Sequence, residues 1–437
     1  MTEVVIASAA RTPIGKFGGS LSSLSSVDLG AIVAKAAIER AGIAAKDVDQ
    51  AIFGNVLQAG SGQNVARQIA LKSGLSTSSC AMTINEVCGS GLKAIRLAQA
   101  AIVMSDAQVV VAGGTESMSN VPFYAQDLRF NEHRYGDYTL IDGLKRDGLC
   151  DAFTGDAMGV TAENVAARFA ISREAQDLFA LKSHQKAVKA QENGEFDAEI
   201  TPVQLADGTL VSKDEHPRAD TSLERLAKLR TLFKPSVDFS DSCGNANNTC
   251  ELEHTTNGRG DEHTPNGCVN EHTTSGCVNE HTPTVTAGNA SGINDGAAAL
   301  VLMSKDYALE HGIDYLAEIV GFAEGGINPD LMGYAPKKVM ERLLNKTGFS
   351  FDDIDLFEIN EAFAAQSIAV SEQLHIDEEK LNVRGGAIAL GHPLGASGAR
   401  ILTTLIYALR DRHLKNGVAA LCVGGGIGVS LQIAMHY

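Results

Sequence analysis

A cysteine near the start of this chain lies in a setting suited to nucleophilic chemistry. Cys88 belongs to the segment NEVCGSG, residues 85–91, directly before a predicted helix. A thiol at a helix start meets converging backbone N–H groups, so we expect its pKa to be lowered. An inert buried cysteine is the alternative, but the flanking glycines weaken it because they let a ligand approach the backbone.

A histidine stands in a second glycine-rich segment, far away in the sequence. His392 is at the centre of GGAIALGHPLGASG, residues 385–398. Histidine is the side chain best suited to move a proton near neutral pH. The segment therefore predicts an acid–base group, with a structural turn that exposes its histidine as the alternative.

Two further segments place polar groups at the ends of predicted strands. Cys422 is followed by VGGG, so its thiol would lie beside free backbone N–H donors, although cysteine is also common in buried strands. Asn360 and Glu361 follow an apolar strand predicted over residues 354–359. They would lie at its C-terminal end, unless Asn360 merely caps a helix.

An internal duplication explains how these segments could meet. Residues 42–53 read GIAAKDVDQAIF and residues 348–359 read GFSFDDIDLFEI, and each follows an amphipathic helix and leads into a strand. The match continues in CGSG at 88–91 and GASG at 395–398, each of which opens a helix. We predict two related α/β halves, with mostly parallel sheets covered on both faces and functional groups at strand ends.

The halves are interrupted by a more polar segment. We assign residues 1–118 plus 287–312 to the N-terminal half and residues 313–437 to the C-terminal half. The charged segment 119–286 is predicted to be an inserted lobe with helices over 161–169 and 173–191.

Part of this lobe, residues 236–283, is of low complexity. It contains the repeats EHTTNGRGD, EHTPNGCVN and EHTTSGCVN, followed by EHTP. Such polar repeats cannot fill a core, which favours a solvated loop. The repeats also carry side chains that zinc prefers, namely His254, His263, Cys268, His272, Cys277 and His281. Because no C-x-x-C pair occurs among them, we predict no functional metal site.

Composition excludes several classes of protein. The 437 residues are 44% hydrophobic and carry a net charge of −17, which argues against nucleic acid as a partner. The apolar stretches are too short to span a membrane. Eight cysteines without a secretory signal indicate reduced thiols in the cytoplasm.

Taken together, the four segments resemble the thiolase family. VCGSG at 87–91, NEAF at 360–363, GHP at 391–393 and CVG at 422–424 match the thiolase motifs in order. The resemblance covers the chain apart from the repeat insert. It implies a thiolase-like α/β fold of two duplicated halves, layered αβαβα, with an inserted loop lobe that binds CoA.

The resemblance also implies a mechanism. Cys88, its proton taken by His392, would attack an acyl-CoA thioester and release CoA. Cys422 would remove a proton from the α-carbon of a second acetyl-CoA. His392 and a water held by Asn360 would stabilise the enolate, and the N–H groups of Cys88 and Gly424 would hold the other thioester oxygen. No cofactor is implied, because the CoA thioester is the substrate.

The same resemblance suggests where CoA binds and how the chain assembles. Residues 214–218, followed by 226–230, resemble the nucleotide-binding stretch of the family. Residues 158–159, 287–291 and 332–333 resemble segments that line its pantetheine channel, with plain glycine turns as the alternative for these three. The implied CoA contacts are Met158, Arg218, Lys228, Ala287 and Ser291. A homo-oligomer, either a dimer or a tetramer, is expected, with a loop within residues 120–150 forming the tetramer.

The implied activity is that of an acetyl-CoA C-acetyltransferase, which converts two acetyl-CoA to acetoacetyl-CoA and CoA. The segment at 147–153 favours this branch over a 3-ketoacyl-CoA thiolase for longer chains. Ala157, where acetoacetyl-forming members usually have histidine, and Tyr334 depart from the family pattern. Two other classes stay open: a decarboxylating condensing enzyme, which lacks a second catalytic cysteine, and an inactive metal-binding relative.

Overall fold

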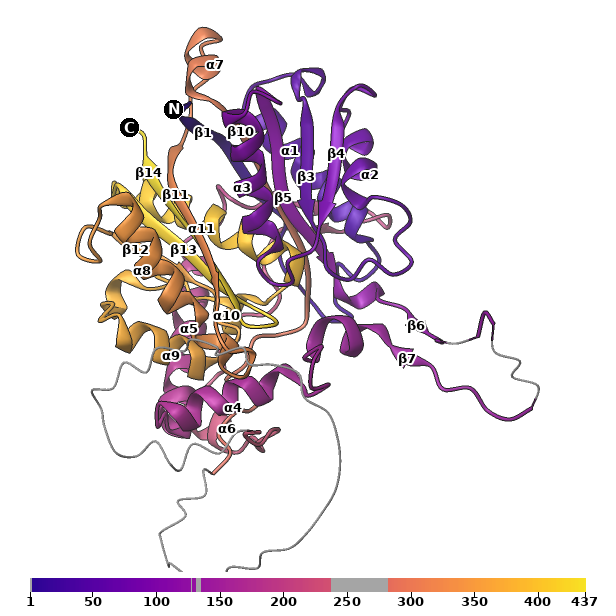
Figure 1. The fold of residues 1–437 in the computed structure, drawn as a ribbon, viewed down its shortest axis with the longest axis vertical. Helices are drawn as coiled ribbons and strands as arrows, with labels where there is room; N and C mark the ends of the chain where they lie inside the picture. Colours follow the sequence, from indigo (N-terminus) through magenta and orange to yellow (C-terminus); the bar gives the residue numbers. More distant parts are fainter. Residues whose placement is uncertain (1, 127, 131–134, 237–281) are drawn as a thin grey trace, which may run out of the picture.

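The computed structural model describes residues 2–126, 128–130, 135–236 and 282–437 (Figure 1). Nearly all of the repeat insert lies outside these ranges, and so does the metal site considered for it.

Ten strands of the described chain form one large sheet. They are β1 (Val4–Arg11), β2 (Gly15–Lys16), β3 (Gln50–Gly54), β4 (Cys80–Ile84), β5 (Val109–Ser117), β10 (Asn294–Ser304), β11 (Ala317–Gly326), β12 (Leu356–Ile359), β13 (Asn416–Val423) and β14 (Ile427–Met435). The order is β12-β13-β14-β11-β1-β10-β5-β3-β4, with β2 on β10. Strand β1 pairs with both β10 and β11 and so joins the two halves.

The prediction of mostly parallel sheets is wrong. The pairs β3–β4, β3–β5 and β12–β13 are parallel, and the other pairs of the large sheet are antiparallel. A hairpin through Gly425 and Gly426, both with positive φ, connects β13 to β14. Strands buried on both faces are apolar throughout in either direction, so their composition could not reveal the direction.

Some helices cover the outer faces of the two halves of this sheet, and others lie between the two halves. The helices of the two halves are α1 (Ser26–Arg40), α2 (Val65–Lys72), α3 (Ser90–Val103), α7 (Lys305–Glu310), α8 (Ala335–Thr347), α9 (Ala364–Gln373), α10 (Ala387–Leu390) and α11 (Ser397–Asp411). One apolar cluster places α1 and α2 against the N-terminal strands, and another places α8 against the C-terminal strands. Helices α3 and α11 share a third cluster with strands of both halves. The layered αβαβα architecture is thereby confirmed.

The central position of α11 follows from its sequence. Every residue from Ser397 to Leu409 is buried, as expected of a helix enclosed on all sides. The short helix η7 (Leu394–Ala396) directly precedes α11, and the loop that contains His392 comes just before η7.

Glycines in the duplicated motifs let α3 and α11 touch through their backbones. A Cβ atom on Gly398 would lie 2.3 Å from Leu92 N, and one on Gly91 would lie 2.7 Å from Ala399 N. Only glycine permits this approach. The starts of both helices, and the functional segments just before them, are therefore fixed relative to each other.

Part of the lobe lies at one end of the molecule, and another part projects from its side as an arm (Figure 1). The lobe contains α4 (Met158–Arg168), α5 (Arg173–Glu192), α6 (Leu223–Ala227) and the strand pairs β6 (Phe123–Tyr124) with β7 (Ile141–Asp142) and β8 (Val203–Gln204) with β9 (Leu210–Val211). The helices predicted over 161–169 and 173–191 correspond to α4 and α5. Among the described residues, no helix has the length and apolar character needed to cross a bilayer.

The contact between α3 and α11 predicts the effect of one added methyl group. Gly398→Ala gains about 1 kcal/mol of helix propensity, yet its Cβ would overlap the backbone of Leu92. Overpacking should dominate and lower the free energy of unfolding by about 1–3 kcal/mol in urea denaturation. Gly325→Ala, whose Cβ would meet only ordinary contacts, is the control, and equal stability of the two variants would contradict this packing.

Candidate active site

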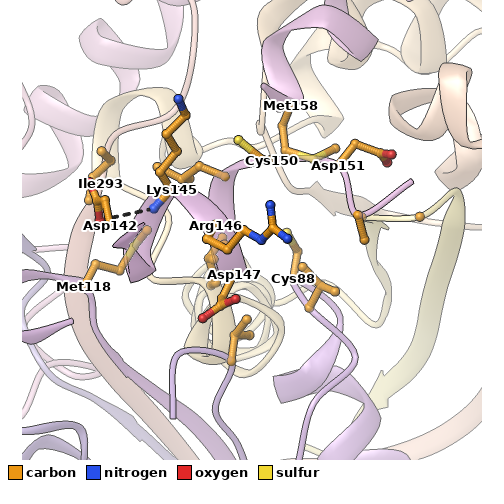
Figure 2. Close-up of a pocket in the computed structure, with 18 of the residues that line it drawn as sticks. Cys88, Met118, Asp142, Lys145, Arg146, Asp147, Cys150, Asp151, Met158 and Ile293 are labelled. Carbon is orange, nitrogen blue, oxygen red and sulfur yellow. Dashed lines mark hydrogen bonds between the residues drawn. The ribbon is translucent and has the colours of Figure 1, made fainter. Parts of the chain in front are cut away.

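One cavity of about 1410 Å³ brings together residues from both halves and from the lobe. Of the residues predicted from the sequence, Cys88, Met158, Ser291, His392 and Gly424 line it. Figure 2 shows Cys88, Met158, Cys150 and Arg146 around this space.

Cys88 lies at the end of a strained turn between β4 and α3. Val87, a β-branched residue, has a φ of 45°, which costs free energy and needs support from its surroundings. Ser90 supplies that support, because its Oγ accepts from Glu86 N at 2.8 Å and donates to Val87 O at 2.7 Å. The turn directs the half-buried Cys88 to the cavity.

The expected lowering of the Cys88 pKa is wrong. Burial raises the pKa of the thiol to about 12, although hydrogen bonds from the N–H groups of Gly424 and of Cys88 itself act in the opposite direction. Loss of water outweighs the helix start here. The thiol is therefore protonated at rest, and a neighbouring base must remove its proton as the sulfur reacts.

His392 is held in one tautomer. Its backbone N–H donates to Asn294 Oδ1 at 3.0 Å, and its Nδ1 lies 2.6 Å from Ser397 Oγ. The Ser397 hydroxyl also lies 2.8 Å from Pro393 O; we assign its single proton to that hydrogen bond, so that Nδ1 donates to Ser397. The lone pair is consequently on Nε2.

Asn360 faces this lone pair, since its Nδ2 is 3.5 Å from His392 Nε2. It does not cap a helix, because the N-cap of α9 is Phe363.

Burial, followed by the positive charge of Arg400, lowers the pKa of His392 to about 3. The imidazole is thus neutral at neutral pH and can accept a proton.

Cys422 lies in the cavity wall rather than at its surface. It is fully buried and packs with Met158, Met332, Ala362 and Phe363, all of which line the cavity. Burial raises its pKa, and the nearby Cys88 raises it further. The two sulfurs are therefore within electrostatic reach of each other.

Ser291 and Met158 reach the cavity from the lobe side. Ser291 N donates to Ala362 O at 2.9 Å, which ties the segment after the insert to the segment that contains Asn360. Met158 is the first residue of α4. Its neighbour Ala157 occupies the N-cap position without a side-chain hydrogen bond.

Other predicted residues lie elsewhere. Arg218 lines a separate hollow of about 200 Å³, where its backbone N–H donates to His184 Nδ1 at 3.2 Å. Lys228 follows α6, and both Lys228 and Ala287 are exposed outside the cavity lining. Tyr334 packs on Phe169, with ring centroids 4.5 Å apart, and does not line the cavity.

Sequence reasoning missed Glu116, which joins the loops around the site. Its buried carboxylate accepts from the N–H groups of Val56, Leu57 and Gly395 and from Asn55 Nδ2, at 2.7–3.1 Å. Burial raises its pKa to about 7. Its place near the end of the apolar, glycine-containing strand β5 was the available signal.

Ser397 and two cations were also missed. Ser397 lies five residues after His392, in the glycine-rich segment 385–398, but only the contact of its hydroxyl with the imidazole reveals its role. Lys145 and Arg146 line the cavity from a π-helix, Lys145–Leu149, a form that is frequent at functional sites. Within the described ranges, no group of three or more potential metal ligands occurs.

These groups can transfer a proton and bind an acyl group. A neutral imidazole can take the proton of one thiol, the resulting thiolate can attack a carbonyl carbon, and backbone N–H groups can hold the developing oxyanion. A second buried thiol provides another acid–base group beside the first.

The tautomer of His392 can be measured directly. Nitrogen-15 NMR of histidine-labelled protein should show a neutral His392 with the proton on Nδ1 from pH 8 to about pH 5, because burial and Arg400 disfavour the imidazolium. His392→Gln identifies the signal, and Ser397→Ala should release the other tautomer. Protonation near the ordinary pKa of 6.5, or a proton on Nε2, would contradict the assignment.

Comparisons with known proteins identify the family of the chain. Residues 4–247 and 261–306 match the family described as "Thiolase, N-terminal domain", and residues 313–435 match "Thiolase, C-terminal domain". The chain is 48% identical to an acetyl-CoA acetyltransferase of Escherichia coli over 436 residues, 99% of each chain.

Solved structures are similar over the whole chain. The acetyl-CoA acetyltransferase of Bacillus anthracis superposes with a TM-score of 0.87 at 39% identity, covering 100% of this chain and 99% of that one. A human mitochondrial 3-ketoacyl-CoA thiolase gives 0.87 at 37% identity, with the same coverage. The chain belongs to the thiolase family.

Proposed function

We propose that this chain is an acetyl-CoA acetyltransferase, which condenses two acetyl-CoA to acetoacetyl-CoA and CoA in a reversible reaction. The observation that carries the proposal is the meeting of Cys88, the Nε2 lone pair of His392 and Cys422 at one cavity between the two halves. Relatives named for this activity are 46–48% identical over 99% of the chain.

In the first half-reaction, His392 Nε2 takes the Cys88 proton while the sulfur attacks the thioester carbon of acetyl-CoA. The N–H groups of Cys88 and Gly424 hold the oxyanion. The bond to the CoA sulfur breaks, and Cys422 gives its proton to that sulfur. The products are acetyl-Cys88, free CoA and a Cys422 thiolate.

In the second half-reaction, the Cys422 thiolate removes the α-proton of a second acetyl-CoA. Asn360, acting through a water, and His392 stabilise the enolate oxygen. The enolate carbon attacks the acetyl carbon, and the bond to Cys88 breaks. His392 returns its proton to the Cys88 sulfur, which restores both thiols.

We also propose how the substrate is held. The lobe, residues 119–286, would bind CoA through Met158 and Arg218, with Lys228 at its surface. The segment that follows the lobe would add Ser291 and the exposed Ala287, and no cofactor would be needed. The two halves would comprise residues 1–118 with 287–312, and residues 313–437.

Longer acyl chains are the alternative, since Ala157 is small and a 3-ketoacyl-CoA thiolase is among the structural relatives. Steady-state thiolysis decides between them. We expect a higher kcat/KM for acetoacetyl-CoA than for a 3-ketoacyl-CoA of about sixteen carbons. Each methylene that a short-chain pocket cannot hold costs about 1–3 kcal/mol of transition-state binding, and a long chain adds many of them. A preference for the long chain would reverse the assignment.

A homo-oligomer is proposed from the apolar arm that contains β6 and β7. Its exposed side chains are Phe123, Phe130, Tyr135, Tyr138 and Leu140. Exposed apolar groups in one segment indicate an interaction surface. Light scattering of the full chain would give a dimer or tetramer, whereas a monomer would contradict this proposal.

The roles of the two cysteines can be separated. After brief exposure to acetyl-CoA, peptide mass spectrometry should find one acetyl group, on Cys88, and none in Cys88→Ser. Cys422→Ala should still accept the acetyl group, although more slowly, because the proton donor to the departing CoA sulfur is lost. It should lose condensation by about 10²-fold or more, because the acceptor of the α-proton is gone. Acetylation of another residue, or full condensation by Cys422→Ala, would refute the assigned roles.

A further inference from the structure

A buried ion pair lies behind His392 and Asn360. Arg400 Nη1 is 3.7 Å from Glu358 Oε2, and each side chain is only 2% exposed. Among the described residues, the guanidinium nitrogens of Arg400 and Oε1 of Glu358 have no hydrogen-bond partner. Burial raises the pKa of Glu358 to about 8, although Arg400 acts in the opposite direction. Burying an ion pair with so little compensation is costly, and apolar replacements are often as stable. Stability alone therefore does not explain the pair.

The position of the pair is informative. Glu358 is on β12, two residues before Asn360, so both side chains leave the same face of the extended chain. Arg400 is on α11, three residues after Ser397, which holds the His392 ring. The pair thus connects the strand that carries Asn360 to the helix that orients His392.

We propose that Glu358 and Arg400 are positioning residues, which set the spacing of β12 and α11 and thereby hold Asn360 Nδ2 against His392 Nε2. This inference rests on the proposed function. The contact it maintains is 3.5 Å long, at the outer limit of a hydrogen bond. A small change in the spacing of the two elements would break it.

The charge of Arg400 also acts on the imidazole. Next to burial, it is the cause that lowers the pKa of His392. The charges that act on Arg400 itself are Glu358, first, and then Arg11 on β1, Glu199 after α5 and Glu361 after β12. Removing the positive charge would raise the pKa of His392, so turnover would be lost at a higher pH than in the wild type.

The test replaces both partners, because removal of one would leave an uncompensated buried charge. Arg400→Met with Glu358→Gln keeps the side-chain volume and removes the charges. In thiolysis of acetoacetyl-CoA we expect kcat to fall by roughly 10- to 100-fold through misplacement of Asn360 and His392. KM should change by less than about 3-fold, since neither residue touches CoA.

Arg384→Met with Asp411→Asn is the control for the loss of a buried arginine. The Arg384 side chain is 1% exposed and lies 2.5 Å from Asp411, which is 36% exposed, and it also contacts Glu195 and Glu199. It makes no ion pair or hydrogen bond with Asn360 or His392. The control should keep kcat within about 3-fold and leave the acid side of the pH profile unmoved. The positioning role is contradicted if both double variants lose kcat equally at equal thermal stability, or if KM changes as much as kcat.

Arg400→Lys provides the rescue, because it keeps the charge with a different donor geometry. It should recover the acid side of the pH profile and part of kcat, whereas unchanged kcat relative to the wild type would also contradict the proposal. If Arg400→Met with Glu358→Gln does not fold, the kcat and pH profile of Arg400→Lys alone test the positioning role. An inactive wild-type protein in the same assay would instead overturn the proposed function, so the two failures are distinguishable.

Discussion

The backbone contact between α3 and α11 is the constraint on which the site depends. Each helix begins directly after a functional segment, and each presents a glycine to the other at its first turn. The distance between the Cys88 turn and the His392 loop is therefore set by main-chain atoms, which cannot adjust as side chains do. Glu116 reinforces this arrangement, because its carboxylate binds N–H groups from loops of both halves.

Burial determines the protonation states of the two thiols and the imidazole in the site. It raises the pKa of both thiols and lowers that of the imidazole, so the resting site holds neutral groups. A preformed thiolate–imidazolium pair would have to exist without water around it, which is costly. In the proposed reaction charge develops only as the sulfur attacks. The N–H groups of Cys88 and Gly424, which lie at the Cys88 sulfur, would then stabilise it.

The layered fold was predictable from the sequence through the resemblance of its four motifs to the thiolase family. Glycine-rich turns and strand ends marked Cys88, His392, Cys422 and Asn360 as candidates, and the duplication predicted that they come from corresponding turns of two halves. Strand direction could not be found, since strands with both faces covered look alike. The roles of Ser397, Glu116 and Arg400 depend on contacts between distant segments, which no local pattern encodes.

The pKa of Cys88 shows the same limit in electrostatic terms. The helix start at Ser90 is visible in the sequence, but the apolar surroundings that outweigh it come from other parts of the chain. The local pattern therefore marked Cys88 as a candidate nucleophile but predicted the wrong direction for the shift of its pKa. Burial has to be known before the two effects can be compared.

A crystal structure of the Cys422→Ala variant after exposure to acetyl-CoA tests the central claim most directly. The account predicts a thioester on the sulfur of residue 88, its oxygen at the N–H groups of residues 88 and 424, and its methyl group in the cavity near the missing thiol. A cavity without the acetyl group, while another thiol of the chain carries it, would contradict the account.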